Sequence, residues 1–162
     1  MAHVRNYLYV MDVRNGSSIA YEYQIDSDTL NLSLPRICLQ PIVENAITHG
    51  LRNVRRKDKR LRISAKRSAG KLVVTISDNG IGMNADEMNR ALEANDPKRV
   101  ESGVSIGILN VNARLKRLFG RIYGLRIESE PGEGTTVILM VPAVESGGNP
   151  AEKKPDEKEM TE

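Results

Sequence analysis

The sequence predicts an α/β two-layer sandwich, in which a mixed, mostly antiparallel sheet is covered on one face by helices. Segments with strand-like alternation are intermingled with segments of helical spacing along the 162 residues. The later strands follow one another in adjacent pairs, which favours antiparallel pairing. Of the residues, 40% are hydrophobic, and the aromatic ones are five tyrosines and one phenylalanine. We therefore expect one domain with a core of aliphatic side chains.

The first half of the chain begins with apolar residues at helical spacing over 3–16, where Gly16 provides a stop signal, so a helix is expected. Residues 18–26 alternate between apolar and polar side chains, which predicts a strand. The run 33–35 ends in a proline and is typical of a helix entry with proline in the first turn. This helix is expected to continue to Gly50, a typical residue for a helix end.

The second half predicts two strands, over 59–68 and 71–80, joined by a tight turn at Ala69 and Gly70. Asn84 and Glu87 have the spacing of a capping box, so a helix is expected over 84–95. An irregular loop should follow. The remaining elements are a helix with apolar residues at helical spacing and two strands around a glycine-rich turn, over 106–120, 123–130 and 134–142.

The single cysteine, Cys38, lies in an apolar run and is interpreted as a small buried hydrophobe. One cysteine excludes an internal disulfide and suits a reducing compartment. The sequence has no apolar run of about 18 residues and no signal-peptide pattern at its N-terminus. We therefore expect a chain that neither spans a membrane nor is exported.

The net charge of +3 is unevenly distributed. Residues 145–162 contain six acids and three lysines, and the polar, proline-containing stretch 144–162 is expected to be a disordered acidic tail. Residues 52–62 contain seven basic residues and one acid, which we call the basic run. The basic run is either a solvated face or a surface for an anion or an acidic partner. Because it lacks interleaved aromatic residues, nucleic acid is not expected as a partner.

Polar residues interrupt the apolar helix expected around "LQPIVENAITHG", where Glu44, Asn45 and His49 occur. Positions four apart share a helix face, so Asn45 and His49 should point where the core points. Burying an unpaired amide costs about 1–3 kcal/mol, and Pro41 inside a helix would cost a further ~3 kcal/mol. Two interpretations stay open: a core asparagine with satisfied hydrogen bonds, or a face that meets a polar ligand.

Two glycine loops favour the ligand. The stretch "SDNGIGM" places Asp78 at a strand end, before Gly80 and Gly82. A carboxylate there can accept a hydrogen bond from an exocyclic amine, and glycines let a flat base approach the backbone. The second loop runs from Gly103 to Gly107 directly into a helix, whose first N–H groups attract phosphate. A third stretch, "EPGEGTT", is by default a hairpin turn.

Together, "LQPIVENAITHG", "SDNGIGM", "SIGILNVNARLKRLFG" and "ESEPGEGTTVILMVP" resemble the catalytic ATP-binding domain of bacterial sensor histidine kinases, in the LytS- and YesM-like branch. The resemblance covers roughly residues 19–141. It implies the Bergerat (GHKL) ATPase fold, shared with DNA gyrase, Hsp90 and MutL. The implied organisation is the end of a connecting helix over 1–16, an ATP-binding catalytic domain over 17–143 and the acidic tail.

The resemblance also implies roles for single residues. Asn45 would bind the Mg²⁺ that bridges the ATP phosphates, which suits a hard ion, and His49 would face the phosphates or the ribose. Glu44 resembles the acid that orients the nucleophile or a metal-bound water, and Asp78 would bind the adenine amino group. The remaining ATP-binding residues would shape the base pocket, cradle the phosphates or close the adenine end: Gly80, Gly82, Met83, Gly103, Ser105, Ile106, Gly107, and Thr135 or Thr136.

Three positions depart from related patterns. Pro41 stands where gyrase-like ATPases carry their base carboxylate, which disfavours an ATPase clamp and favours transfer to a histidine. Ser105 stands where the phosphate loop usually has its middle glycine, and Thr48 stands where many histidine kinases have a lysine. These two departures raise the alternative of a regulatory nucleotide-binding or docking module that has lost transfer competence.

The implied function is a cytoplasmic domain that transfers the ATP γ-phosphate to a histidine on a separate domain. No acceptor-type helix sequence is found, and His3 is interpreted as solvent-exposed. The expected cofactors are ATP and Mg²⁺. The expected partners are the phosphoacceptor and dimerisation helices of the parent kinase and a downstream response regulator, and the parent is expected to be a membrane-anchored homodimer.

Overall fold

The computed structural model describes residues 19–35, 37–96 and 106–145. The expectations for the segment 1–16 and for the tail from residue 146 onward lie outside the described residues, as does most of the loop expected after the third helix. The described elements, in chain order, are β1 (Ile19–Ile25), η1 (Ser27–Thr29), α2 (Leu39–Asn45), η2 (Ala46–Leu51), β2 (Lys59–Ser68), β3 (Lys71–Asp78), α3 (Ala85–Ala94), α4 (Ile106–Phe119), β4 (Gly124–Glu130) and β5 (Gly134–Pro142).

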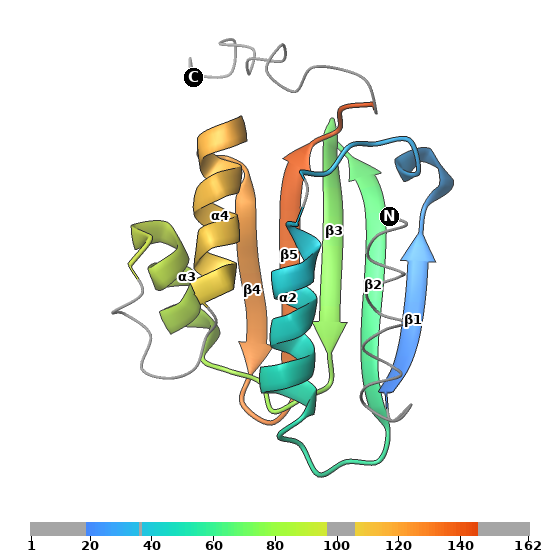
Figure 1. The fold of residues 1–162 in the computed structure, drawn as a ribbon, viewed down its shortest axis with the longest axis vertical. Coiled ribbons are helices and arrows are strands. Elements are labelled where there is room, and N and C mark those ends of the chain that lie inside the picture. The colour runs from blue at the N-terminus through green and yellow to red at the C-terminus, as the bar shows by residue number, and fades with distance from the viewer. Residues whose placement is uncertain (1–18, 36, 97–105, 146–162) are drawn as a thin grey trace.

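The five strands form one sheet in the order β1-β2-β3-β5-β4 (Figure 1). The pairs β2–β3, β3–β5 and β4–β5 are antiparallel, and β1 pairs with β2 in parallel. The predicted mixed, mostly antiparallel sheet is therefore confirmed. The parallel pair exists because α2 and η2 intervene between β1 and β2 and return the chain to the same end of the sheet.

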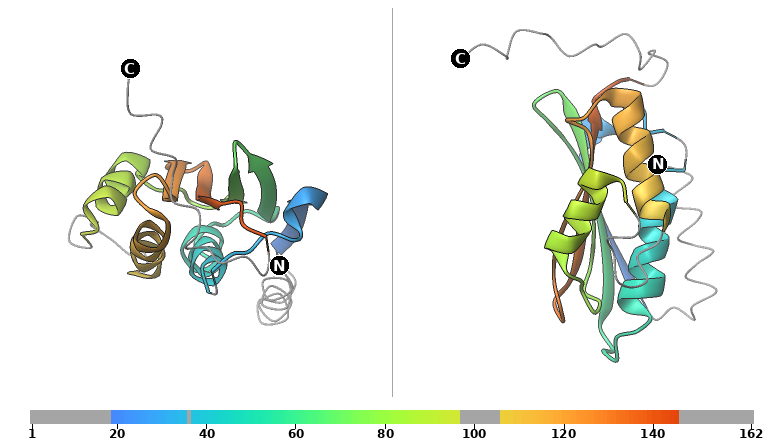
Figure 2. Two further views of the ribbon diagram at one scale, coloured as in Figure 1. Left: turned by 90° about the horizontal axis from the view of Figure 1, so that it is seen from above. Right: turned by 90° about the vertical axis from the view of Figure 1, so that its left-hand side faces the viewer.

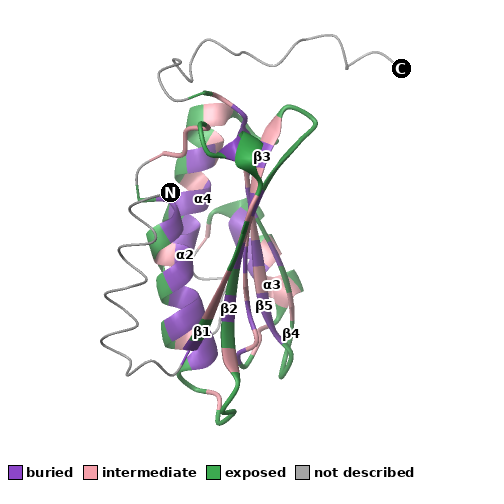
Figure 3. Cartoon of the chain, turned by 90° about the vertical axis from the view of Figure 1, so that its right-hand side faces the viewer, coloured by how far each residue is buried: buried purple, intermediate pink, exposed green. Residues whose placement is uncertain are grey.

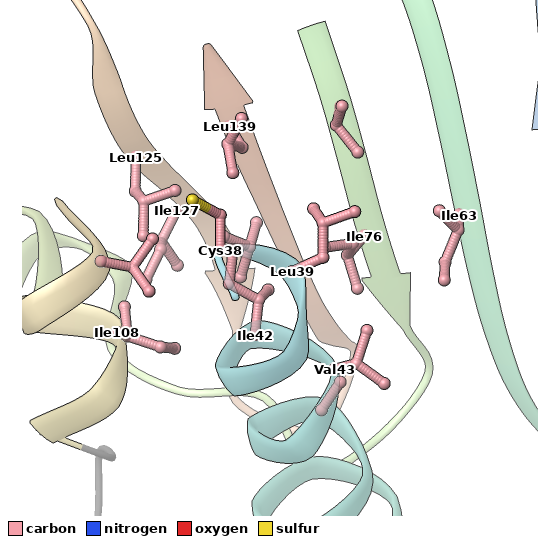
Figure 4. Close-up of a cluster of buried hydrophobic side chains, with 14 of the residues drawn as sticks. Cys38, Leu39, Ile42, Val43, Ile63, Ile76, Ile108, Leu125, Ile127 and Leu139 are labelled. Atoms are coloured by element: carbon pink, nitrogen blue, oxygen red, sulfur yellow. The ribbon is translucent and has the colours of Figure 1, made fainter. Parts of the chain in front are cut away.

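The helices α2 and α4 lie on one face of the sheet, α3 lies beside the edge strand β4, and no described helix covers the opposite face (Figure 2). The strands alternate accordingly, and the buried positions of β3 are Leu72, Val74, Ile76 and Asp78. Figure 3 shows buried residues along α2, α4 and the strands that they cover. The core is aliphatic, as predicted: Ile42 and Val43 of α2 and Ile76 and Leu139 of the sheet belong to one buried cluster, and Cys38 is 2% exposed (Figure 4).

The helix that carries Asn45 begins later than the sequence predicted. Pro35 precedes it, and Ile37 has a positive φ of 65°, a left-handed conformation that stops a helix from extending back to residue 33. Because α2 starts at Leu39, Pro41 lies in its first turn, where a backbone N–H has no partner within the helix. The expected cost of ~3 kcal/mol for Pro41 therefore does not apply.

Two of the predicted local signals are confirmed. The Asn84 side chain caps α3 by accepting a hydrogen bond from the Glu87 N–H, at 3.1 Å. The turn between β2 and β3 has positive φ angles at Ala69 and Gly70, 46° and 72°, which is the geometry of a tight two-residue hairpin. One boundary differs: the chain stays in the fold to Glu145, which forms a bridge with Leu32, so the tail cannot begin at 144.

None of the described helices has both the length and the apolar character needed to cross a membrane.

Candidate functional site

Three segments that are distant in the sequence meet at one end of the sheet, the lower end in Figure 1. They are the end of η2, the loop that follows β3, and the turn between β4 and β5. Gly50 O accepts a hydrogen bond from the N–H of Ile81 at 3.2 Å, and Ile81 O accepts one from the N–H of Gly132 at 2.6 Å. The loop after β3 is thus held between the other two segments.

Asp78, the last residue of β3, is the buried acid of this junction and is 7% exposed. Its Oδ1 accepts a hydrogen bond from the Gly80 N–H at 2.8 Å. Burial raises the pKa of this carboxyl from 3.8 to about 6, although the backbone N–H groups of Gly80 and Thr135 act in the opposite direction. At neutral pH the carboxylate therefore remains charged, and it is a strong acceptor in a poorly solvated place.

The space around Asp78 is made by glycines. A Cβ on Gly80 would come within 2.6 Å of Asp78 Oδ1, and a Cβ on Gly50 would come within 2.7 Å of the same atom. Gly82 has a φ of 68°, and a side chain there would overlap the backbone of Glu130. Sequence reasoning interpreted Gly50 only as a helix end and missed this role, because the proximity to Asp78 leaves no mark in the local pattern.

Asn45 is the buried amide of the junction, at 3% exposure. Within the described part of the chain, its Oδ1 has no hydrogen-bond partner. An orphaned buried oxygen costs about 1–3 kcal/mol, so this observation favours the second interpretation, in which this face meets a polar ligand. The oxygen is a suitable ligand for a hard cation such as Mg²⁺.

The neighbours of Asn45 on α2 and η2 are less buried than the sequence suggested. Glu44 is exposed, and its Oε1 accepts a hydrogen bond from Gln40 Nε2 at 3.1 Å. His49 is half-buried, and its backbone carbonyl accepts from Asn53 Nδ2 at 3.3 Å. Glu44 faces solvent, because adjacent helical residues are turned by about 100° and Glu44 directly precedes the buried Asn45.

The predicted phosphate loop is described only in part. Ile106 and Gly107 form the first turn of α4, and Ile106 is 65% exposed. Gly103 and Ser105 lie outside the described residues. Met83 packs partly buried against the core, and its backbone N–H donates to Ser129 Oγ at 2.9 Å. This bond ties the loop after β3 to strand β4.

The structure separates the two threonines between which the sequence could not choose. Thr135 lies opposite Asp78 in the register of β3 and β5 and is 4% exposed. Thr136 lies opposite Ser77, and the two hydroxyl oxygens are 2.8 Å apart. Because neighbouring residues of a strand point to opposite faces, Thr135 shares the helix-covered face with Asp78, and Thr136 belongs to the uncovered face.

The basic run lies beside this junction. Arg56 Nη1 donates to Asn79 O at 2.8 Å, and Asn79 Nδ2 donates to Asp58 O at 2.8 Å, so the run is tied to the chain directly after Asp78. A depression of about 400 Å³ adjoins it. Its lining is mostly charged and polar: Glu22, Arg56, Asp58, Arg60, Arg62, Ser77, Asp78, Asn79 and Glu133.

Comparison with known proteins identifies the family. The family model described as "Histidine kinase-, DNA gyrase B-, and HSP90-like ATPase" matches residues 33–145. The sensor histidine kinase YesM of Bacillus subtilis is 34% identical over 86% of this chain, and the sensor histidine kinase YpdA of Escherichia coli is 32% identical over 86%. The chain spans 22% and 23% of the lengths of these two relatives.

Solved structures agree on the fold. The histidine kinase domain of the Erythrobacter litoralis EL346 blue-light activated kinase superposes with a TM-score of 0.59 at 20% identity, covering 88% of this chain and 60% of that one. Full-length ShkA, solved in complex with AMPPNP, superposes with a TM-score of 0.64 at 17% identity, covering 90% of this chain and 30% of that one. The chain thus belongs to the histidine kinase-, DNA gyrase B- and HSP90-like ATPase family, with sensor histidine kinases as its relatives.

Proposed function

We propose that this chain binds Mg·ATP as the catalytic domain of a two-component sensor histidine kinase and transfers the γ-phosphate to a histidine on another domain. The observation that carries the proposal is the orphaned Oδ1 of Asn45, buried at the same end of the fold as the carboxylate of Asp78. The burial of the Asn45 oxygen and of the Asp78 carboxylate does not stabilise the fold. Their hydrogen-bonding capacity is instead suited to a polar ligand.

In this proposal the adenine base occupies the glycine-lined space at Asp78. The carboxylate accepts a hydrogen bond from the exocyclic amine, and Thr135 closes the base end. Gly80, Gly82 and Met83 shape the pocket, and His49 faces the ribose or the phosphates. The triphosphate extends toward the start of α4, where Ile106 and Gly107 offer backbone N–H groups, with Gly103 and Ser105 in the preceding loop.

Asn45 would hold the Mg²⁺, which neutralises charge on the phosphates when it is bound. In the transfer step, a nitrogen of the acceptor imidazole forms a bond to the γ-phosphorus. The bond from that phosphorus to the bridging oxygen breaks, ADP leaves with the electron pair, and the imidazole proton passes to solvent. Glu44, which is exposed next to Asn45, would orient the incoming imidazole. Positioning supplies most of the rate enhancement.

The partners follow from the kind of kinase to which the chain is related. They would be the dimerisation and phosphoacceptor helices of a parent kinase and, downstream, a response regulator. The parent would be a membrane-anchored homodimer that holds this domain in the cytoplasm. The sensor kinases among the relatives, several times longer than this chain, support this setting.

The test is a transfer assay with three outcomes. The chain is mixed with γ-labelled ATP, Mg²⁺ and a purified phosphoacceptor domain from a related sensor histidine kinase. Acid-labile, base-stable label on the acceptor, lost when its histidine is replaced, supports the proposal. Nucleotide binding without label would contradict transfer and identify a regulatory module. Free phosphate released without an acceptor would identify an ATPase.

A further inference from the structure

The hydroxyl of Ser129 lies where three segments of the candidate site meet, and neither the motifs nor the family pattern used above assigns it a role. Ser129 belongs to β4, next to the turn that leads into β5 (Figure 1). Its Oγ donates to Gly134 O at 2.6 Å and accepts from the Met83 N–H at 2.9 Å. A third contact, of 3.1 Å, joins Ser129 Oγ to Thr135 Oγ1.

Counting protons assigns the direction of this third bond. A serine hydroxyl has one proton and two lone pairs. The proton is given to the carbonyl of Gly134, which can only accept, and one lone pair is taken by the N–H of Met83, which can only donate. The second lone pair is left for Thr135, so Thr135 is the donor in that pair. The threonine proton is then directed at Ser129, and only lone pairs remain for any other partner.

The second polar side chain on this face, that of Asp78, is also a hydrogen-bond acceptor. Asp78 lies directly opposite Thr135 in the register of β3 and β5, and both residues are buried on the helix-covered side. An ionised carboxylate is an acceptor only. The two side chains at this end of the sheet therefore both present acceptors, and a partner must bring hydrogen-bond donors to satisfy them.

We propose that Ser129 is a specificity-determining residue, which holds the Thr135 hydroxyl as an acceptor and thereby makes the base site select an amino-substituted purine over an oxo-substituted one. The inference rests on the proposed function, because it concerns the base site of the nucleotide. Adenine carries an amino group at C6, with two N–H donors. Hypoxanthine and guanine carry a carbonyl oxygen there, which would face two acceptors with no proton between them.

The chain contains a matched control on the other face of the same strands. Ser77 and Thr136 form a hydroxyl pair at 2.8 Å, one register position away from Asp78 and Thr135. Ser77→Ala removes a serine hydroxyl from a Ser–Thr pair just as Ser129→Ala does, but on the uncovered face. A general effect of losing such a pair would appear in both variants, whereas an effect on the base site would appear only in Ser129→Ala.

The experiment measures the affinities of ADP and IDP by isothermal titration calorimetry at pH 8. The ratio of the two affinities reports base selectivity, and tripolyphosphate is titrated as a probe without a base. In Ser129→Ala the Thr135 proton is released to face the C6 oxygen, so the ADP-to-IDP ratio should fall by about tenfold. Tripolyphosphate affinity should not change. Ser77→Ala should keep the wild-type ratio.

Further variants keep the inference testable if Ser129→Ala does not fold. Ser129→Cys has a similar volume but a weaker donor and acceptor, so it should lower the ratio in the same direction. Thr135→Val should lower the ratio, and Thr135→Ser, which keeps the hydroxyl, should restore it. Adding Ser129→Ala to Thr135→Val should change the ratio no further, because the hydroxyl on which Ser129 acts is already gone.

The failure of the inference and the failure of the proposed function are distinguishable. If the wild-type chain binds neither ADP nor IDP, the proposed function is overturned. If the wild type prefers ADP and the Ser129 variants keep that preference in full, only the role of Ser129 is overturned. An equal loss of selectivity in Ser77→Ala would overturn it as well, because the effect would then belong to the sheet and not to the base site.

Discussion

Two buried asparagines show how a single residue can serve stability or binding. Asn112 of α4 is fully buried, and its amide is satisfied twice: Nδ2 donates to Leu92 O at 2.7 Å, and Oδ1 accepts from the Leu125 N–H at 2.9 Å. It joins α4 to the end of α3 and to β4. Asn45 is almost as buried, yet its Oδ1 lacks a partner among the described residues. The two asparagines are distinguished by whether the hydrogen bonds of their amides are satisfied, more than by how far they are buried.

We expect opposite phenotypes when each asparagine is replaced by alanine. Asn112→Ala should lower the free energy of unfolding by about 2–3 kcal/mol, since it strands a buried N–H and a buried carbonyl. Asn45→Ala should not lower it, because an orphaned group is removed, but should abolish the Mg²⁺ dependence of nucleotide affinity. Urea unfolding and titration calorimetry with and without Mg²⁺ measure both effects. Retained Mg²⁺ dependence in Asn45→Ala would remove its role as a ligand.

Asp78 carries a stability cost that depends on pH. Its folded-state pKa of about 6 lies above the ordinary 3.8, so the folded protein holds this proton more tightly than the unfolded chain does. The stability linked to that proton is complete below about pH 4 and is lost as the pH rises through 6. At pH 8 the loss is on the order of 3 kcal/mol.

We therefore expect Asp78→Asn, which cannot ionise, to unfold at higher urea concentration than the wild type at pH 8, and this advantage should shrink toward pH 4. The same variant should lose its preference for adenine nucleotides. Urea titrations at several pH values test the first point. A stability difference that does not change between pH 4 and pH 8 would show that Asp78 is not the group that titrates.

At the scale of elements, the turn from α2 into η2 brings the site together. The helix widens after Asn45, and the N–H of Arg52 bonds to Ile47 O at 2.9 Å, a span of five residues that is typical of a π-helix. The widened turn places Gly50 against Asp78 and Gly80. Such turns occur often at functional sites, and here the turn joins Asn45 to the glycine-lined space around Asp78.

Replacing Gly50 tests this contact. In Gly50→Ala the new Cβ would lie 2.7 Å from Asp78 Oδ1 and 3.1 Å from its Cγ, and the backbone of Asp78 is held in β3. We expect a loss of about 1–3 kcal/mol in stability and at least a tenfold loss in adenine nucleotide affinity. Thr48→Ala, exposed in the same turn, is the control and should be close to wild type. Calorimetry that shows unchanged nucleotide affinity in Gly50→Ala would contradict the crowding of Asp78.

Pro41 tests where α2 begins. Because it lies in the first turn, Pro41→Ala should change the free energy of unfolding by less than about 1 kcal/mol. Thermal or urea unfolding of the purified variant measures the change. A gain near 3 kcal/mol would mean that the helix extends well before Leu39, with the proline in its interior.

At the scale of the whole molecule, the candidate site exists only when the sheet has formed. Its parts come from residues 45–50, from 78–83 and from 129–135, which the pairing of β3 with β5 and of β4 with β5 brings to one end. Local segments cannot form it, so ligand binding and global folding are linked.

We therefore expect ADP with Mg²⁺ to raise the free energy of unfolding by about 2.7 kcal/mol at a hundredfold excess over its Kd. Hydrogen exchange should slow most at the backbone amides of the three segments that meet, and much less in the turn between β2 and β3 at the far end. Differential scanning fluorimetry and exchange measured by mass spectrometry check the two parts. Protection confined to one of the three segments would contradict a shared site.

Much of the fold is determined by local chemistry. The alternation in β3, the Asn84 cap and the hairpin at Ala69 and Gly70 each depend on a few neighbouring residues, and each is found where the sequence predicted it. Asp78 and Asn45 were predicted as site residues for a related reason, since a short polar side chain within an apolar segment is easily recognised in a sequence. Their roles in binding ATP and Mg²⁺ stay predictions until they are measured.

By itself, the sequence thus determined the class of the sheet, the aliphatic core and the motifs that mark the family. Only the tertiary structure decided that α2 begins at Leu39, that Thr135 and not Thr136 shares a face with Asp78, and that Gly50 and Ser129 belong to the junction. The physical reason is distance along the chain. Strand register and the contacts between loops are set by packing between segments tens of residues apart, and no local pattern encodes which atoms meet there.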